Sequence, residues 1–198
     1  TAFIIEADMR GYSVGPQYEK LGMKGAGNAE LIFDNVRVPA ANRLGDEGKG
    51  MKICLGTLDE GRIGIACQAV GIAQAVLDRC VEYVKERKQF GKPIAEYQAM
   101  QWMLVDMACK IESARLLMYK AAKTMDEGGN PVKAASMAKL VASEAAMDIA
   151  TKGIQVFGGY GYMMDSPMQR YFRDAKLTEI YEGTSEVQRM VIARDLLR

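Results

Sequence analysis

The stretch MQWMLVDMACKIESARLLMYKA, residues 100–121, decides the fold class of this 198-residue chain. Its apolar residues recur at steps of four and three, at Met100, Leu104, Met107, Ile111, Ala114, Met118 and Ala121. This spacing places them on one face of a helix, because an α-helix has about 3.6 residues per turn. The stretch therefore predicts a long helix that packs through one apolar face against other elements.

Four further helical segments are expected after residue 50. Gly91-Lys92-Pro93 ends the first of them, and Asp126–Pro131 is a stop-turn-start signal before an Ala-rich one. The expected segments are residues 51–88, 132–156, 168–176 and 185–197. Three long helices and a shorter fourth predict a mainly α fold, with an antiparallel four-helix bundle over residues 46–198.

The residues before this bundle carry strand signals. Phe3-Ile4-Ile5 and residues 29–38 are rich in β-branched and aromatic residues, and Pro39 ends the second run. Residues 1–45 are therefore expected to be the end of a small β-domain. The chain starts without Met, as if in the middle of a strand, so it is expected to begin partway through a larger protein.

Charge balance and missing residue types exclude several functions. With 26 Lys and Arg against 25 Asp and Glu, nothing drives the chain electrostatically toward nucleic acid or an anionic membrane surface. No apolar run is expected to span a bilayer. The chain has no His, which excludes a Ser-His-Asp triad, a Cys-His pair and an HExxH zinc site. A general base must then be a carboxylate, Lys, Tyr or Cys, and no metal site is expected.

The four cysteines, at positions 54, 67, 80 and 109, are too few for a disulfide framework and never approach C-x-x-C spacing. They are expected to be small apolar residues in a reducing compartment, either a bacterial cytoplasm or a mitochondrial matrix. The first residues lack a charged segment followed by an apolar one, so no targeting segment is visible.

Three segments have both a structural and a functional interpretation. Asp59-Glu60-Gly61-Arg62 is either a solvated helix face or an Arg directed at an anionic ligand group. Arg87–Pro93 suits a helix C-terminus, yet a cation and an aromatic residue there can also bind a dinucleotide. The paired glycines of Gln155–Tyr162 end a helix or admit a phosphate or ring to the backbone. They do not follow a strand, so a Rossmann motif is rejected.

A fourth segment, Tyr181–Glu186, contains the best candidate for a general base. Thr184 or Ser185 can cap the last helix, and Glu186 suits its first turn. These roles leave Glu182 unexplained. An acid between an aromatic residue and a Gly, in a short loop facing bundle helices, can be partly buried, which suits a general base.

Together, Arg87–Gly91, Gln155–Tyr162, Arg173-Asp174-Ala175-Lys176 and Ile180–Arg189 resemble the acyl-CoA dehydrogenase family, in the family's order and spacing. Residues 57–66, TLDEGRIGIA, look most like the short-chain (butyryl-CoA) and short/branched-chain members. The family fold has an N-terminal helical domain, a middle β-domain and a C-terminal four-helix bundle. The resemblance covers the end of the β-domain and the bundle, and the parts before them contribute flavin contacts and part of the acyl pocket.

The resemblance implies that Glu182 takes the α-proton of a short- to medium-chain or branched acyl-CoA while the β-hydrogen leaves as hydride to N5 of FAD, which gives a trans-2-enoyl-CoA. The Glu182 backbone N–H would donate to the thioester oxygen. The FAD contacts implied are Arg87, Gln98, Gln155, Val156, Phe157, Gly158, Gly159, Thr184, Ser185 and Glu186. The substrate contacts implied are Asp59, Glu60, Gly61, Arg62, Tyr181 and Gly183. Arg87 and Gln155–Gly159 would reach the FAD of a neighbouring subunit.

Some relatives carry the base on the first bundle helix, directly before the Arg. Here that position is Gly61, which has no side chain to serve as a base. Glu60 is adjacent, but one residue turns about 100° around a helix, so its side chain is expected to face elsewhere. Glu182 is therefore preferred over Glu60.

The family also implies a homotetramer, a dimer of dimers, that passes electrons to electron-transferring flavoprotein. The alternatives are a non-enzymatic helical scaffold of the same fold, a member that acts on a cyclic or aromatic acyl-CoA, and an enoyl-CoA reductase. A DNA-associated member is disfavoured by the near-zero net charge and the lack of a basic C-terminal extension.

Overall fold

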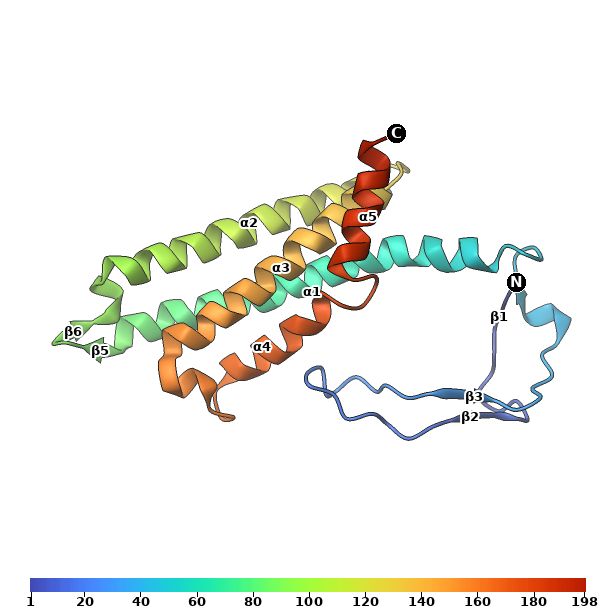
Figure 1. Cartoon of the computed structure of the whole chain (residues 1–198), viewed down its shortest axis with the longest axis horizontal. Coiled ribbons are helices and arrows are strands. Elements are labelled where there is room, and N and C mark those ends of the chain that lie inside the picture. Colours follow the sequence, from blue (N-terminus) through green and yellow to red (C-terminus); the bar gives the residue numbers. More distant parts are fainter. The chain divides into compact units, whose positions relative to one another are not determined.

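The computed structural model describes residues 1–198, which form two compact units, Thr1–Leu58 and Asp59–Arg198 (Figure 1). The division falls inside the first long helix, α1 (Gly50–Glu86). The domain boundary expected after residue 45 stays a prediction.

The first unit contains two small antiparallel strand pairs. β1 (Ala2–Phe3) pairs with β4 (Arg43–Leu44), and β2 (Tyr12–Val14) pairs with β3 (Leu31–Phe33). The register sets Tyr12 opposite Phe33, with ring centroids 5.5 Å apart. A short 3-10 helix, Ala40–Asn42, precedes β4. Strand signals near residues 3–5 and 29–38 thus predicted the places of β1 and β3.

The second unit is a bundle of five helices. They are α1 from Asp59 onward, α2 (Gln98–Asp126), α3 (Val132–Phe157), α4 (Pro167–Thr178) and α5 (Ser185–Leu196). A third strand pair, β5 (Lys88–Gln89) with β6 (Lys92–Pro93), leads through the 3-10 helix Ile94–Glu96 into α2. The predicted mainly α fold is confirmed, with three long helices and two short ones.

The stripe on α2 forms part of the core. Met107, Ile111, Ala114, Met118 and Ala121 are buried, while Met100 and Leu104 at the start of the stripe are partly buried. α3 packs on α2, α4 and α5, and it is the central helix of the bundle. Its small residues allow close packing: a Cβ on Gly153 would lie 2.5 Å from Cγ1 of Val76 on α1.

By length and composition α1 can cross a membrane, which corrects the expectation that no apolar run is long enough. One such helix is weak evidence, because the core helix of a soluble protein meets the same criterion. Here the apolar residues of α1 form part of the bundle core. They include Ala66, Ala69, Ala73, Val76, Cys80 and Val84.

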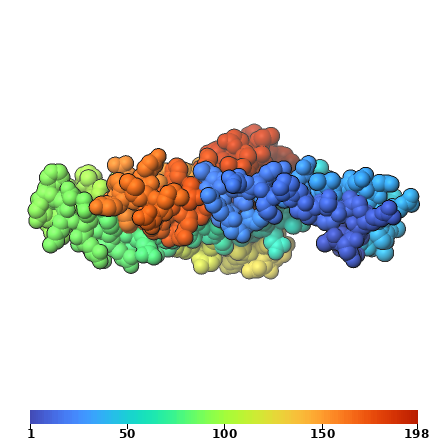
Figure 2. Space-filling model, turned by 90° about the horizontal axis from the view of Figure 1, so that it is seen from below, coloured from blue at the N-terminus to red at the C-terminus, as the bar shows by residue number.

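At one end of the bundle, the last turn of α1 lies beside the residues that follow α3. A 3-10 helix, Gly158–Tyr162, continues from α3 and leads to α4. Figure 2 shows these residues and the start of α4, in orange, next to the green β5–β6 segment.

At the start of α5 the Thr184 hydroxyl oxygen accepts a hydrogen bond from the Val187 N–H, as expected of an N-cap.

Candidate active site

The loop between α4 and α5 holds Glu182 in an uncommon backbone conformation. Its φ is +54°, and the next residue, Gly183, has φ +91°. Gly adopts positive φ freely, but for a residue with a Cβ the left-handed region costs about 1–2 kcal/mol. Such strain persists only where neighbouring groups hold the backbone, and it is concentrated at functional sites.

Hydrogen bonds from two buried side chains hold this turn. The Lys139 Nζ on α3 donates to the Gly183 carbonyl oxygen at 2.8 Å. The Gln188 Nε2 on α5 donates to the same oxygen at 2.9 Å and to the Glu182 carbonyl oxygen at 3.1 Å. The Ser185 N–H closes the loop by donating to the Glu179 carbonyl oxygen at 3.0 Å. Nothing in the sequence singled out Lys139 or Gln188.

The Glu182 carboxylate is directed at Gly61 on α1. A Cβ added to Gly61 would lie 2.5 Å from Oε2 and 2.9 Å from Cδ of Glu182. The Oε2 atom is buried and has no hydrogen-bond partner within the chain. Glu60 is exposed, in agreement with its expected direction around the helix. The site thus presents a buried, unpaired acceptor where the helix lacks a side chain.

Asp59 and Arg62 lie on the same turn of α1. Arg62 is only 6% exposed, and its Nη1 is 2.7 Å from the Asp59 Oδ1. The Arg62 Nε is buried without a partner. A mostly buried ion pair does not fit a solvated helix face. The interpretation that Arg62 is directed at an anionic ligand group stays a prediction.

Tyr181, the residue before the base candidate, donates its hydroxyl proton to Gln68 Oε1 on α1. Burial raises the pKa of the Tyr181 phenol, the Gln68 hydrogen bond opposes that rise, and the Glu182 charge adds to it. At the start of α5, the Ser185 Oγ is buried without a partner. The pKa of the Glu186 carboxyl is lowered by its own backbone N–H and by the Thr184 hydroxyl. These residues surround the Glu182 turn.

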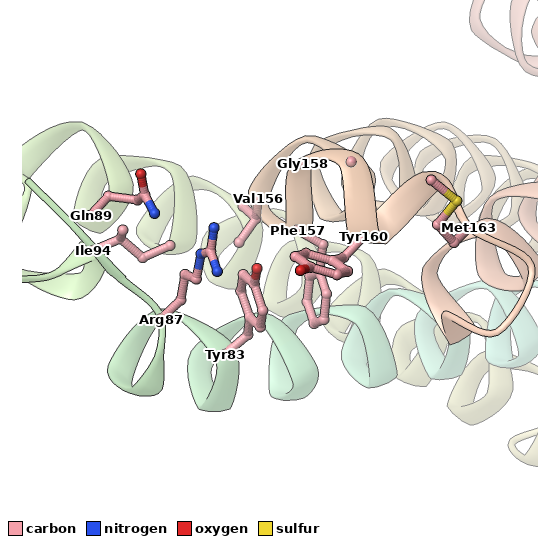
Figure 3. Close-up of a pocket in the computed structure, with 10 residues that line it drawn as sticks. Tyr83, Arg87, Gln89, Ile94, Val156, Phe157, Gly158, Tyr160 and Met163 are labelled. Atoms are coloured by element: carbon pink, nitrogen blue, oxygen red, sulfur yellow. The ribbon is translucent and has the colours of Figure 1, made fainter.

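A second group of predicted site residues lines a pocket of about 460 Å³ at the end of the bundle (Figure 3). Of the predicted residues it contains Arg87, Val156, Phe157, Gly158 and Gly159. Gln155 and Gln98 are exposed and do not line the pocket, so their role stays a prediction. Gln89 and Tyr160 also line the pocket; they lie in the segments given a functional interpretation but were not named as contacts. Tyr83, Ile94 and Met163 lie outside every predicted site segment.

The chemistry of this pocket suits part of a dinucleotide. Figure 3 shows Arg87 beside Tyr83, facing the segment that follows α3. The Arg87 guanidinium lies 5.7 Å from the centroid of the Tyr160 ring, and the Tyr83 and Phe157 rings stack at 4.0 Å. Gly158 has φ +59°, and a Cβ there would meet no atom within 4 Å. A cation, open glycine backbone and aromatic faces fit a phosphate and a flat ring.

No hydrogen bond joins this pocket to the Glu182 turn, so the predicted residues form two separate groups. No cluster of three or more His, Cys, Asp or Glu side chains can hold a metal ion.

Comparison with known proteins identifies the family. Residues 48–197 match the model of the acyl-CoA dehydrogenase C-terminal domain. The chain is 52% identical over 197 residues to an acyl-CoA dehydrogenase of Bacillus subtilis, covering 100% of this chain and 52% of that protein. It is 47% identical over 198 residues to the caffeyl-CoA reductase–Etf complex subunit CarC of Acetobacterium woodii, covering 100% and 52%.

Among solved structures, the chain is similar to the butyryl-CoA dehydrogenase of Megasphaera elsdenii, with a TM-score of 0.98 and 50% identity. That match covers 99% of this chain and 51% of the other. The chain spans about half the length of the curated relatives it matches. The matched domain and the level of identity show that this chain belongs to the acyl-CoA dehydrogenase family.

Proposed function

We propose that this chain supplies the catalytic base of an FAD-dependent dehydrogenase that converts a short- to medium-chain acyl-CoA, straight or branched, to its trans-2-enoyl-CoA. The observation that carries the proposal is the Glu182 carboxylate, whose Oε2 is buried, unpaired and directed at a helix position without a side chain. A scaffold has no use for a buried unpaired acceptor in a strained turn, because both are unfavourable.

In this proposal Glu182 removes the proton from the carbon next to the thioester. When bound, FAD supplies the acceptor for the hydride that leaves the neighbouring carbon. Removing a proton from carbon places negative charge on the thioester oxygen, which must be stabilised by a hydrogen bond. The Glu182 backbone N–H donates to no group within the chain, so it is available for that oxygen.

The remaining site residues have supporting roles in the proposal. Arg87 and residues 155–159 contact FAD in a neighbouring subunit, while residues 184–186 contact the FAD of their own. Tyr181 and Gly183 lie at the acyl-thioester end, and Asp59 and Arg62 line the channel for CoA. The open backbone of Gly158 and the buried Ser185 Oγ, which lacks a partner, support these assignments.

The proposal includes a homotetramer and electron transfer to electron-transferring flavoprotein. Trp102, Val105, Leu116 and Tyr119 form an exposed stripe on α2, each between 58% and 61% exposed. Exposed apolar side chains grouped on one face of a helix are typical of surfaces that become buried in oligomers. The A. woodii relative is a subunit of a complex with Etf, which supports the flavoprotein partner.

A second candidate is the reverse reaction, reduction of an enoyl-CoA, because the same A. woodii relative belongs to a reductase complex. The same base position serves both directions, since a proton removed in one direction is returned in the other.

The test uses the flavin-loaded protein and its visible spectrum under anaerobic conditions. Addition of butyryl-CoA is expected to bleach the flavin band, and Glu182→Gln is expected to abolish that bleaching while retaining flavin. Glu82→Gln is the matched control, because Glu82 is an exposed acid on the same helix, α1, and is not among the predicted site residues. Unchanged bleaching in Glu182→Gln, or no bleaching of the wild type by any acyl-CoA in a chain-length series, refutes the proposal.

A further inference from the structure

Lys139 is a fully buried cation on α3, the central helix of the bundle. It is 0% exposed on α3, next to the buried residues Ala138 and Ala142. It forms no ion pair, and its one hydrogen bond is the 2.8 Å contact from Nζ to the Gly183 carbonyl oxygen. Lysine is almost never fully buried without a partner, because removing an ammonium group from water is unfavourable. A buried Lys that gives its only hydrogen bond to one backbone oxygen calls for an explanation.

The electrostatic surroundings do not supply that explanation. Burial lowers the pKa of the Lys139 ammonium. The charge of Glu179 raises that pKa, the charge of Arg62 lowers it, and Glu186 and Glu144 raise it further. None of the three acids is within ion-pair distance of Nζ, so Lys139 is not placed there to neutralise a buried acid.

The contact does explain how the strained turn persists. Glu182 and Gly183 both have positive φ, and the Gly183 carbonyl accepts two hydrogen bonds, from Lys139 and from Gln188. Lys139 lies on α3 and Gln188 on α5, so the oxygen is fixed from two directions. A hydrogen bond from a charged donor is about twice as strong as one from a neutral donor, so the Lys139 bond contributes more.

We infer that Lys139 is a positioning residue for the catalytic base: through the Gly183 carbonyl it holds the Glu182–Gly183 turn so that the Glu182 carboxylate faces Gly61. This inference rests on the proposed function in one respect, namely that Glu182 is the base. It assigns no contact between Lys139 and substrate or cofactor.

Three variants test the inference in the flavin-loaded protein. Lys139→Met removes the donor and keeps most of the volume, and Lys139→Gln keeps a neutral donor. Ser136→Ala is the matched control, because Ser136 is also 0% exposed, lies one turn earlier on α3 and has no hydrogen-bond partner. Each variant is measured by amide hydrogen exchange and by the rate of flavin bleaching with butyryl-CoA.

In Lys139→Met the Ser185 amide, which closes the loop by donating to the Glu179 carbonyl oxygen, is expected to exchange faster, while the amides of α3 and of α5 beyond its first turn stay protected. The bleaching rate is expected to fall by about ten- to a hundredfold, because a base displaced by about 1 Å loses rate on that scale. The apparent affinity for butyryl-CoA should change little. Lys139→Gln should recover part of the rate, and Ser136→Ala should match the wild type in both measurements.

Unchanged exchange of the Ser185 amide in Lys139→Met overturns the inference. So does faster exchange spread evenly over α3 and α5, because that result assigns Lys139 a purely structural role. The exchange measurement does not depend on catalysis. If Glu182→Gln bleaches as the wild type does, the proposed function fails, and the exchange data still decide whether Lys139 holds the turn.

Discussion

Replacing Gly61 with Ala separates the stability of α1 from the position of the base. In a helix interior Ala is favoured over Gly by about 1 kcal/mol, so helix propensity alone predicts a more stable protein. The structure adds an opposing effect, because the new Cβ would lie 2.5 Å from the Glu182 Oε2, whereas ordinary contact begins near 3.4 Å. The carboxylate must therefore retreat by about 0.9 Å from its place.

A displacement of that size at a reacting group lowers a rate by about a hundredfold, which corresponds to about 2.7 kcal/mol in activation free energy. We therefore expect Gly61→Ala to bleach flavin with butyryl-CoA about a hundredfold more slowly. Its free energy of unfolding should stay within about 1 kcal/mol of the wild type, because the helix gain offsets the rearranged carboxylate. Stopped-flow absorbance and urea unfolding measure the two quantities.

Gly64→Ala is the matched control, since Gly64 lies on the same helix and a Cβ there meets no atom within 4 Å. It should gain the helix stabilisation and keep the wild-type rate. A second check uses the shorter Glu182→Asp, whose carboxylate withdraws from α1, so that adding Gly61→Ala should then cost little further rate. A wild-type rate in Gly61→Ala, or an equal loss in Gly64→Ala, would refute the assignment of this close approach to catalysis.

Three further predictions follow from single residues. Burial raises the pKa of the Cys80 thiol to about 12, so a thiol reagent at neutral pH should label the three exposed cysteines and reach Cys80 only after unfolding. Gly158→Ala should weaken FAD retention and lower stability by about 1–3 kcal/mol, because the backbone there (φ +59°, ψ −139°) lies in a region that residues other than Gly rarely adopt; equilibrium dialysis and urea unfolding measure these effects. Burial raises the pKa of the Asp148 carboxyl, but hydrogen bonds from Lys110 and Lys152 outweigh it and leave the pKa below its ordinary 3.8. The hydrogen-bonded, ionised Asp148 therefore stabilises the folded protein above pH 3.8, and this contribution is lost as the pH falls through the lowered pKa. Asp148→Asn should reduce the free energy of unfolding at pH 7 by no more than about 1 kcal/mol, and by less at pH 3.

Helix positions could be predicted from sequence because their signals are local. The α2 stripe repeats every three or four residues, and the same residues are buried in the structure. Pro131 and Gly158 mark the two ends of α3 for reasons contained in their own backbones. The division between the two units was harder to predict, because it lies inside the continuous helix α1, where no change in composition marks it.

The candidate site was predictable only where residue type carries the signal. Glu182 was predicted because capping and helix-end roles explain its neighbours but not an acid in this short loop. Gly61 was singled out only through the family resemblance. Lys139 could not be predicted in this way. It lies 44 residues from Gly183 in the sequence, and a Lys in an Ala-rich helix is ordinarily expected to be exposed to solvent. Tyr83 and Met163 line the pocket because the end of α1 lies beside the segment after α3. No local sequence pattern predicts this contact between distant segments.

Two departures from ordinary backbone and side-chain preferences coincide at one turn, and each explains the other. A left-handed Glu182 is unfavourable in isolation, and so is a fully buried Lys139. The hydrogen bond from Lys139 to Gly183 stabilises the turn with a charged donor, and the turn supplies the oxygen that the buried ammonium needs. Neither departure follows from packing alone, because an apolar side chain at position 139 and a Gly at position 182 would remove both. Together they hold a carboxylate oxygen that is buried, unpaired and directed at Gly61 on α1, which is consistent with the proposed removal of a substrate proton.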